Sequence, residues 1–166
     1  MTKSLVRWLL PALALGLVLL LPPAHAQEQA LGPLVSAEWL QRNLQRADLL
    51  LIDASMGHER AAAGHIPGSV HVEFYAYGVR DLPQAQMERL IQNWGVSPGR
   101  KVVLYDAGGT YMAARVLWDL YRHGVPAADL AILDGGIARW KAAGGAVTKE
   151  PTLAPQIGRA SCRERV

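Results

Sequence analysis

The sequence contains a single cysteine, Cys162, which lies close to the C-terminal end of its 166 residues. One cysteine excludes an intramolecular disulfide framework and any zinc site built from several cysteines. Charged residues are also scarce, at 19%, whereas 51% of the residues are hydrophobic, which excludes a disordered chain. The length fits one domain and hardly allows two.

No apolar run is long enough to cross a bilayer as a helix. The longest, Trp8–Leu21, falls short of the roughly 20 residues that a membrane span requires. Basic residues precede this run, and Ala24–Ala26 follows it with the small side chains of a signal-peptidase site. The arrangement predicts a signal peptide over residues 1–26, cleaved after Ala26, and an exported, periplasmic protein that begins at Gln27. The alternative is an uncleaved membrane anchor, which the short run disfavours.

The C-terminal tail has no apolar periodicity, no turn residues and no amphipathic face. One choice of codons for residues 157–166 reproduces a common short-read sequencing adapter, so we interpret them as translated adapter and exclude them from the fold. We therefore expect the native sequence to be cut near Gln156, within a linker that starts at residues 149–156. Cys162 falls in the adapter, where nothing folded would hold a reactive thiolate.

Setting the two ends aside removes the basic character of the chain. The formal net charge of all 166 residues is +3. Of the 17 Lys and Arg residues, two lie in 1–26 and three in 157–166, which leaves 12, while 13 of the 14 Asp and Glu residues remain. Residues 27–156 thus carry a net charge of −1, and we expect no nucleic-acid partner.

The remaining residues alternate between short apolar runs and amphipathic helical patterns. Runs typical of strands occupy residues 49–52, 70–74, 102–105 and 130–133. Helical patterns occupy residues 36–44, with Ser36 as the cap, 83–94, 110–123 and 137–143. Residues 54–63 are predicted to form turns. The alternation predicts one α/β domain with a parallel sheet covered by helices on both faces.

Aspartates follow three of the predicted strands directly, at Asp53, Asp106 and Asp134. Parallel α/β sheets bind their ligands at the carboxyl ends of the strands. In the loop that starts at Asp106, Gly108 and Gly109 let backbone N–H groups converge, and the next helix directs its positive end to the same point. Such a loop can cradle an anion. Because Asp106 is itself an anion, we expect a structural loop that accepts its own N–H groups and repels anionic substrates.

The other polar and aromatic candidates favour structural roles. No two histidines have the spacing of a metal site, so we expect neither a metal nor a cofactor. Asp119 and Arg122 are expected to form an exposed helix pair. Arg115 could face the loop or an interdomain cleft, although we expect it to be structural. Core packing is predicted for the tryptophans Trp39, Trp94, Trp118 and Trp140.

Six segments, in this order and at this spacing, resemble the rhodanese sulfurtransferases. They are Val35–Leu40 (VSAEWL), Leu50–Ala54 (LLIDA), Gly64–Ser69 (GHIPGS), Val102–Asp106 (VVLYD), Ala113–Leu120 (AARVLWDL) and Leu133–Trp140 (LDGGIARW). The resemblance covers about residues 34–145. It implies the rhodanese-like α/β fold, a five-stranded parallel sheet flanked by helices, which we place at residues 35–148 after a short lead at 27–34.

The resemblance also implies a reaction. In active members, a cysteine at the start of the cradle loop accepts a sulfane sulfur from thiosulfate or 3-mercaptopyruvate as a persulfide and passes it to cyanide or a thiol. The equivalent loop here consists of Asp106, Ala107, Gly108, Gly109, Thr110 and Tyr111. Asp106 stands at the cysteine position and cannot carry a persulfide. We therefore expect no catalytic residue in this chain.

Tandem members of the family pair an N-terminal domain that has Asp in the loop with a C-terminal domain that has the cysteine. The chain resembles that N-terminal half, which implies an inactive, structural domain whose partner is a missing C-terminal catalytic rhodanese domain. Small sulfur-containing anions would be substrates of the intact protein. Two alternatives stay open: a free-standing, cysteine-less periplasmic module for binding or sensing, and a phosphatase of rhodanese-like fold, which needs a loop cysteine and a longer loop.

Overall fold

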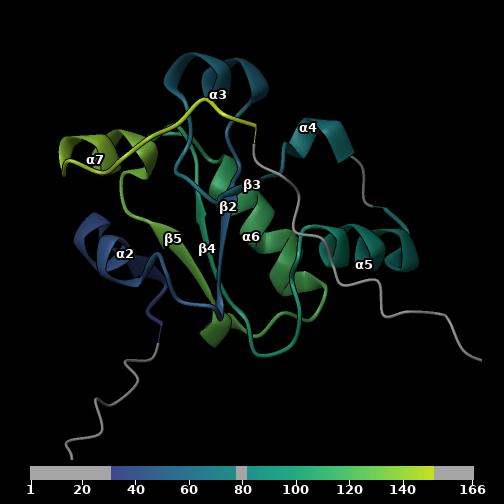
Figure 1. The fold of residues 1–166 in the computed structure, drawn as a ribbon. Helices are drawn as coiled ribbons and strands as arrows, with labels where there is room; N and C mark the ends of the chain where they lie inside the picture. Colours follow the sequence, from purple (N-terminus) through teal and green to yellow (C-terminus); the bar gives the residue numbers. More distant parts are fainter. Residues whose placement is uncertain (1–30, 78–81, 152–166) are drawn as a thin grey trace, which may run out of the picture. The chain divides into compact units, whose positions relative to one another are not determined.

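The computed structural model describes residues 31–77 and 82–151. The predicted signal peptide, the adapter residues and Cys162 lie outside these ranges. The described residues form a five-stranded parallel sheet with helices on both faces, as the sequence predicted (Figure 1). In this part of the chain, no helix has both the length and the apolar character needed to cross a membrane.

The order of the strands across the sheet is β1-β5-β4-β2-β3. Their bounds are β1 Leu34–Val35, β2 Leu49–Asp53, β3 Val70–His71, β4 Lys101–Tyr105 and β5 Leu130–Leu133. All five residues of β2 are buried, as are the last four of the central strand β4. Strands covered on both faces have continuous apolar sequences, which is why the sequence alone located them.

In the described ranges, six α-helices and one 3-10 turn lie between the strands or follow the last one. They are α2 Ala37–Asn43, α3 Gly57–Ala63, α4 Phe74–Tyr77, α5 Gln84–Asn93, α6 Met112–Arg122, the 3-10 turn η2 Ala127–Asp129, and α7 Gly136–Ala142. The four predicted helices are confirmed, with ends within two residues of the prediction. Ser36 caps α2 as expected, because its hydroxyl oxygen accepts a hydrogen bond of 3.1 Å from the Trp39 backbone N–H.

Two separate hydrophobic clusters fill the two sides of the sheet, because successive side chains of a strand point to opposite faces. Leu50 and Leu104 pack with α4, α5 and α6 on one side. Leu51 and Val103 pack with α2 and α7 on the other. The helix α3 contributes no buried residue and lies beyond the carboxyl ends of the strands (Figure 1).

Three segments differ from the prediction. The run at 70–74 is a strand only over Val70–His71, and Phe74 begins α4, where its buried ring meets the Tyr77 ring edge-on at 5.5 Å. Residues 57–63 form the helix α3, where the sequence predicted turns. The sequence did not reveal this helix because a helix with no buried residue carries no apolar stripe. The strand β1 has only two residues, too few for any periodic pattern, and it begins at Leu34 in the predicted lead.

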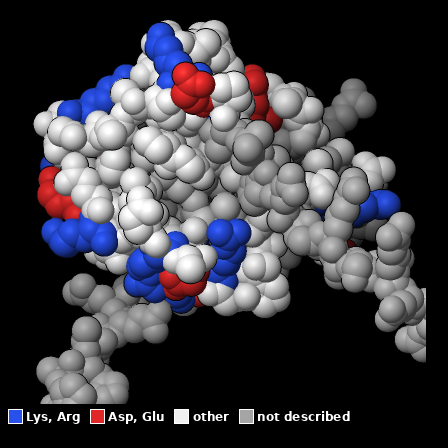
Figure 2. All heavy atoms as spheres, in the orientation of Figure 1, with Lys and Arg blue, Asp and Glu red and all other residues white. Residues whose placement is uncertain are grey.

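The charged side chains do not gather into a patch of one sign on the face of the molecule drawn in Figure 2. Lys and Arg side chains lie next to Asp and Glu around its margin, and the middle of the face is largely uncharged (Figure 2). Mixed charges of this kind produce little long-range field of either sign.

Candidate functional site

The three aspartates at the ends of strands have different surroundings. Asp134 is exposed and lies 3.7 Å from Arg139 in an exposed ion pair. Asp53 and Asp106 are buried, with 0% and 6% of their surfaces exposed. The strands β2 and β4 that precede them are neighbours in the sheet, so the buried polar chemistry of the carboxyl edge is concentrated there.

The carboxylate of Asp106 occupies the loop that follows β4. One oxygen accepts a hydrogen bond from the Gly108 N–H at 2.9 Å. The other accepts bonds from the Thr110 hydroxyl at 2.6 Å and from the Ala113 N–H, in the first turn of α6, at 3.1 Å. The carboxylate therefore takes up donors of the loop and of the helix N-terminus that an external anion would otherwise use.

The start of α7 holds this loop in place. Gly108 has a φ of +97°, and a Cβ at this position would come within 2.7 Å of the Gly135 carbonyl oxygen. The Ile137 N–H donates to the Asp106 carbonyl oxygen at 2.9 Å. The backbones of the loop and of α7 can approach this closely only if residue 108 is glycine, because any side chain there would clash with the Gly135 backbone.

The six residues of this loop, 106–111, include no cysteine. A carboxylate is not a sulfur nucleophile. At the end of the loop, Tyr111 extends into the solvent and is 60% exposed. Its hydroxyl lies 3.0 Å from the hydroxyl of Tyr75 on α4, and this hydrogen bond raises the pKa of Tyr75.

We expect Asp106→Asn to destabilise the domain by about 1–3 kcal/mol, because one amide oxygen cannot replace two carboxylate oxygens and leaves buried donors without acceptors. Urea denaturation followed by circular dichroism measures the change. The matched control is Asp134→Asn, at the exposed end of β5, with an expected change within about 0.5 kcal/mol. Equal effects of the two substitutions would contradict the structural role assigned to the Asp106 carboxylate.

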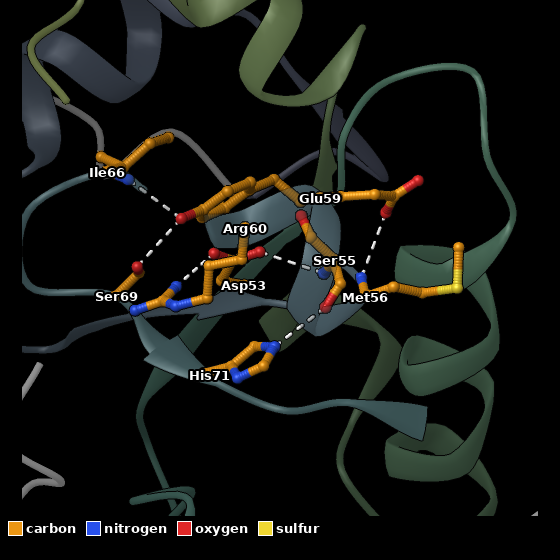
Figure 3. Close-up of polar contacts among 9 residues, drawn as sticks. Asp53, Ser55, Met56, Glu59, Arg60, Ile66, Ser69 and His71 are labelled. Carbon is orange, nitrogen blue, oxygen red and sulfur yellow. Dashed lines mark hydrogen bonds and ion pairs between the residues drawn. The ribbon is translucent and has the colours of Figure 1, made fainter. Parts of the chain in front are cut away.

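A second polar cluster surrounds Asp53 at the end of β2 (Figure 3). The Arg60 guanidinium on α3 forms a short ion pair with one carboxylate oxygen. The other oxygen accepts a hydrogen bond from the Ser55 N–H at 3.0 Å. The side chain of Asp53 is fully buried and that of Arg60 is 14% exposed, so the pair joins α3 to the sheet away from water.

The phenol of Tyr105, at the end of β4, joins the same cluster. Its oxygen accepts a hydrogen bond from the Ile66 N–H at 3.0 Å and lies 2.9 Å from the Ser69 hydroxyl oxygen. Both partners belong to the segment Gly64–Ser69. Burial raises the pKa of Tyr105 and the nearby Asp53 carboxylate raises it further, so the phenol stays neutral. Through the Ile66 N–H and the Ser69 hydroxyl, this segment completes a buried hydrogen-bond network.

The two histidines of this region, His65 and His71, both lie against neighbouring backbone. Burial lowers the pKa of His65, and its backbone pairs with Thr148 through two hydrogen bonds of 2.9 Å. The His71 Nε2–H donates to the Ser55 carbonyl oxygen at 2.9 Å. Within the described ranges, no three His, Cys, Asp or Glu side chains come together as a metal site would require.

The sequence indicated one member of the Asp53 cluster and missed its partner. Asp53 stood out because it ends an apolar strand, but Arg60 lies in the segment predicted as turns. The only available signal was that a buried aspartate needs a cation, and Arg60 is the first arginine after it.

The predicted exposed pair of Asp119 and Arg122 is wrong for Asp119, which is buried. Its carboxylate accepts a hydrogen bond of 2.7 Å from the Tyr77 hydroxyl and lies 3.3 Å from the Arg115 guanidinium. The guanidinium also lies 4.8 Å from the centre of the Phe74 ring. Arg115 therefore links α4 to α6, which is the structural role expected of it.

The predicted core position of Trp118 is also wrong. Trp94 and Trp140 are buried and Trp39 is partly buried, but Trp118 is 51% exposed on the outer side of α6. Apolar neighbours in the sequence suggested burial, but the buried stripe of α6 passes through Val116 and Leu120.

Two hollows lie elsewhere on the domain. One of about 360 Å³ lies between the ends of α5 and α6, and the other, of about 480 Å³, lies beside Arg60, His71 and the segment Lys149–Pro151. Neither is lined by a residue of the Asp106 loop.

The parallel sheet, with helices on both faces and a glycine-containing loop after its central strand β4, defines a small α/β domain. The family model described as Rhodanese-like domain matches residues 36–143, and the chain belongs to this family. The resemblance inferred from the six sequence segments is thereby confirmed.

The relatives are sulfurtransferases. The chain is 36% identical over 145 residues to a probable 3-mercaptopyruvate sulfurtransferase of Pseudomonas aeruginosa, covering 74% of this chain and 49% of the relative. It is 32% identical over 127 residues to thiosulfate/3-mercaptopyruvate sulfurtransferase 2 of Arabidopsis thaliana, covering 68% and 36%. The crystal structure of the Escherichia coli 3-mercaptopyruvate sulfotransferase SseA shares the fold, with a TM-score of 0.63, 24% identity and coverage of 72% and 52%. The chain spans about half the length of these relatives, or less.

Proposed function

We propose that this chain is the non-catalytic N-terminal domain of an exported tandem-rhodanese sulfurtransferase. In the intact protein, a cysteine in a second domain would take the outer sulfur of thiosulfate, or the sulfur of 3-mercaptopyruvate, as a persulfide. Sulfite or pyruvate would leave, and cyanide or a thiol would then accept the sulfur. Within this proposal, the role of the present domain is to pack against the catalytic domain.

The single observation that carries the proposal is the state of the cradle loop. Asp106 stands where the nucleophile would be, and its carboxylate accepts the hydrogen bonds of Gly108, Thr110 and Ala113. A loop in this state has neither an attacking atom nor free donors on its Gly108 and Ala113 amides. The lengths of the relatives support the proposed second domain, because the chain matches only 49% of one sulfurtransferase and 36% of another.

We expect the 166-residue chain to produce no thiocyanate from thiosulfate and cyanide. The reason is that the covalent step needs a thiolate in a helix-terminus cradle, and the loop provides a carboxylate. A colorimetric thiocyanate assay over a range of protein concentrations measures this.

The variant Cys162→Ser is the control for the assay, because Cys162 is the only thiol in the chain. The two proteins should behave alike. Turnover by both would contradict the inactive-domain proposal, and turnover lost in Cys162→Ser would assign sulfur chemistry to the tail instead of the loop.

The competing function is a free-standing, cysteine-less module that binds or senses a partner. The observation in its favour is that the Asp106 carboxylate finds its hydrogen-bond donors, the Gly108 and Ala113 N–H groups and the Thr110 hydroxyl, within the domain itself. The gene sequence beyond Gln156 separates the two. A second rhodanese domain with a loop cysteine supports the enzyme, whereas an early stop codon supports the module.

Export is checked by the intact mass of the secreted protein, which should begin at Gln27.

A further inference from the structure

The outer surface of α6 has aromatic side chains where a surface helix normally has polar ones. Tyr111, Trp118 and Tyr121 are 60%, 51% and 51% exposed, and Tyr75 on the neighbouring α4 is 48% exposed. We call these four residues, together with the exposed Ala114 between them, the aromatic face. Among the described residues, they include four of the six large hydrophobic side chains that are exposed.

The aromatic face consists of two contacting pairs of rings that follow one side of α6. Positions 111, 114, 118 and 121 are spaced three or four residues apart, which places them on one side of a helix. The Trp118 and Tyr121 rings lie 6.0 Å apart, and the Tyr75 and Tyr111 hydroxyls are hydrogen-bonded at 3.0 Å. The face therefore extends from the end of the cradle loop, at Tyr111, along most of α6.

Structure inside the domain does not explain this exposure. The opposite side of α6 packs Val116 and Leu120 into the core, so the helix is already anchored. Rigid aromatic side chains that remain exposed on an anchored helix are typical of surfaces that bind a partner.

The size of the aromatic face favours a tethered partner over a free one. A fully buried aromatic side chain removes about 150–250 Å² from water, so four half-exposed rings present on the order of 400 Å². A stable complex between free proteins buries about 800 Å² on each side. A covalent linker supplies a high effective concentration, so a tethered domain needs a smaller surface.

We infer that the aromatic face is the surface against which a second rhodanese-like domain of the same polypeptide packs. This inference rests on the proposed function, because it requires that second domain. It adds where the domain binds: along the outer side of α6 and α4, beginning beside the Asp106 loop. The partner surface is expected to be apolar at its centre, with acceptors for the exposed tyrosine hydroxyls.

Hydroxyl-radical footprinting tests this inference at single residues. The 166-residue chain is compared with the protein extended as its gene encodes it. We expect the oxidation of Trp118 and Tyr121 to be severalfold slower in the extended protein, because a second domain covers them. Trp39, which lies on α2 at the other side of the sheet, is the control and should react equally in both.

The substitution Trp118→Lys gives an independent measurement. Because Trp118 is exposed, the variant should leave the unfolding midpoint of the 166-residue chain nearly unchanged, and it should lower the midpoint of the extended protein. Equal midpoint shifts in both proteins would contradict the inference.

The remaining outcomes separate the inference from the proposed function. If the extended protein transfers sulfur while Trp118 and Tyr121 stay fully reactive, the proposed function stands and the inference fails. If the gene encodes no second domain, both fail. If the 166-residue chain sediments as a dimer with Trp118 already protected, the occupant is a second copy of the chain, which also overturns the inference.

Discussion

Replacing Arg60 by alanine is expected to cost about 3–5 kcal/mol of folding free energy, since removing one partner of a buried ion pair leaves the other charge uncompensated. The side chain of Asp53 has no exposure to water, so its carboxylate could not be solvated in the folded state. Because small domains are stable by only about 5–15 kcal/mol, the variant should be partly or largely unfolded at room temperature. Urea denaturation followed by circular dichroism measures the loss.

The matched control for Arg60→Ala is Arg46→Ala. Arg46 pairs with Asp48 at 2.6 Å, but their side chains are 33% and 42% exposed. Exposed pairs contribute at most about 1 kcal/mol, so this variant should be close to the parent protein. If the Arg60 variant simply fails to fold, Arg60→Lys keeps the positive charge and should recover part of the stability. Similar losses for Arg46→Ala and Arg60→Ala would contradict the importance assigned to the buried pair.

Replacing Gly136 by alanine is expected to cost about 2–5 kcal/mol, from a left-handed backbone conformation and from overpacking together. Gly136 has a φ of +56°, and a Cβ there would lie 2.8 Å from the Gly108 nitrogen and 3.0 Å from the Gly108 Cα, besides colliding with the Asp106 carbonyl oxygen. All of these are backbone atoms, which cannot move aside as a flexible side chain can. The cradle loop would have to shift away from α7.

The other end of α7 has a control for this substitution. Gly144 has a φ of +77°, but a Cβ there would meet nothing within 4 Å. Gly144→Ala should therefore show only the conformational cost, about 1–2 kcal/mol. Thermal unfolding of both variants measures the difference. If the two lose the same amount, the contact between the Asp106 loop and the start of α7 does not constrain this part of the fold.

Together, these variants probe the two polar structures at the carboxyl edge of the sheet. The Asp53–Arg60 pair joins α3 to β2, and the Asp106 loop joins β4 to α6 and α7. In each of these structures, a buried carboxylate stabilises the fold by bonding to groups of the same domain. These two carboxylates lie at the edge of the sheet where α/β domains commonly bind their ligands.

Much of the fold could be predicted from the sequence, because strands covered on both faces and amphipathic helices leave patterns within a few consecutive residues. The runs at 102–105 and 130–133 lie within the strands that formed. The helix α3 and the strand β1 left no such pattern, the first because it buries no side chain and the second because it has two residues. Phe74 was predicted to lie in a strand because the apolar and polar residues of 70–74 alternate as they do in a strand. In the structure, Phe74 begins α4.

For the candidate site, the resemblance of the sequence to the rhodaneses was enough to predict that Asp106 stands at the position of the family's cysteine. A carboxylate cannot form a persulfide in any fold, so that prediction needed no coordinates. Tertiary structure decided which partners the buried charges have: Arg60 for Asp53, and Arg115 with Tyr77 for Asp119. It also decided that Trp118 faces outward. These partners lie on different elements, and the side of a helix that meets the core depends on how the elements pack, which no local pattern of residues contains.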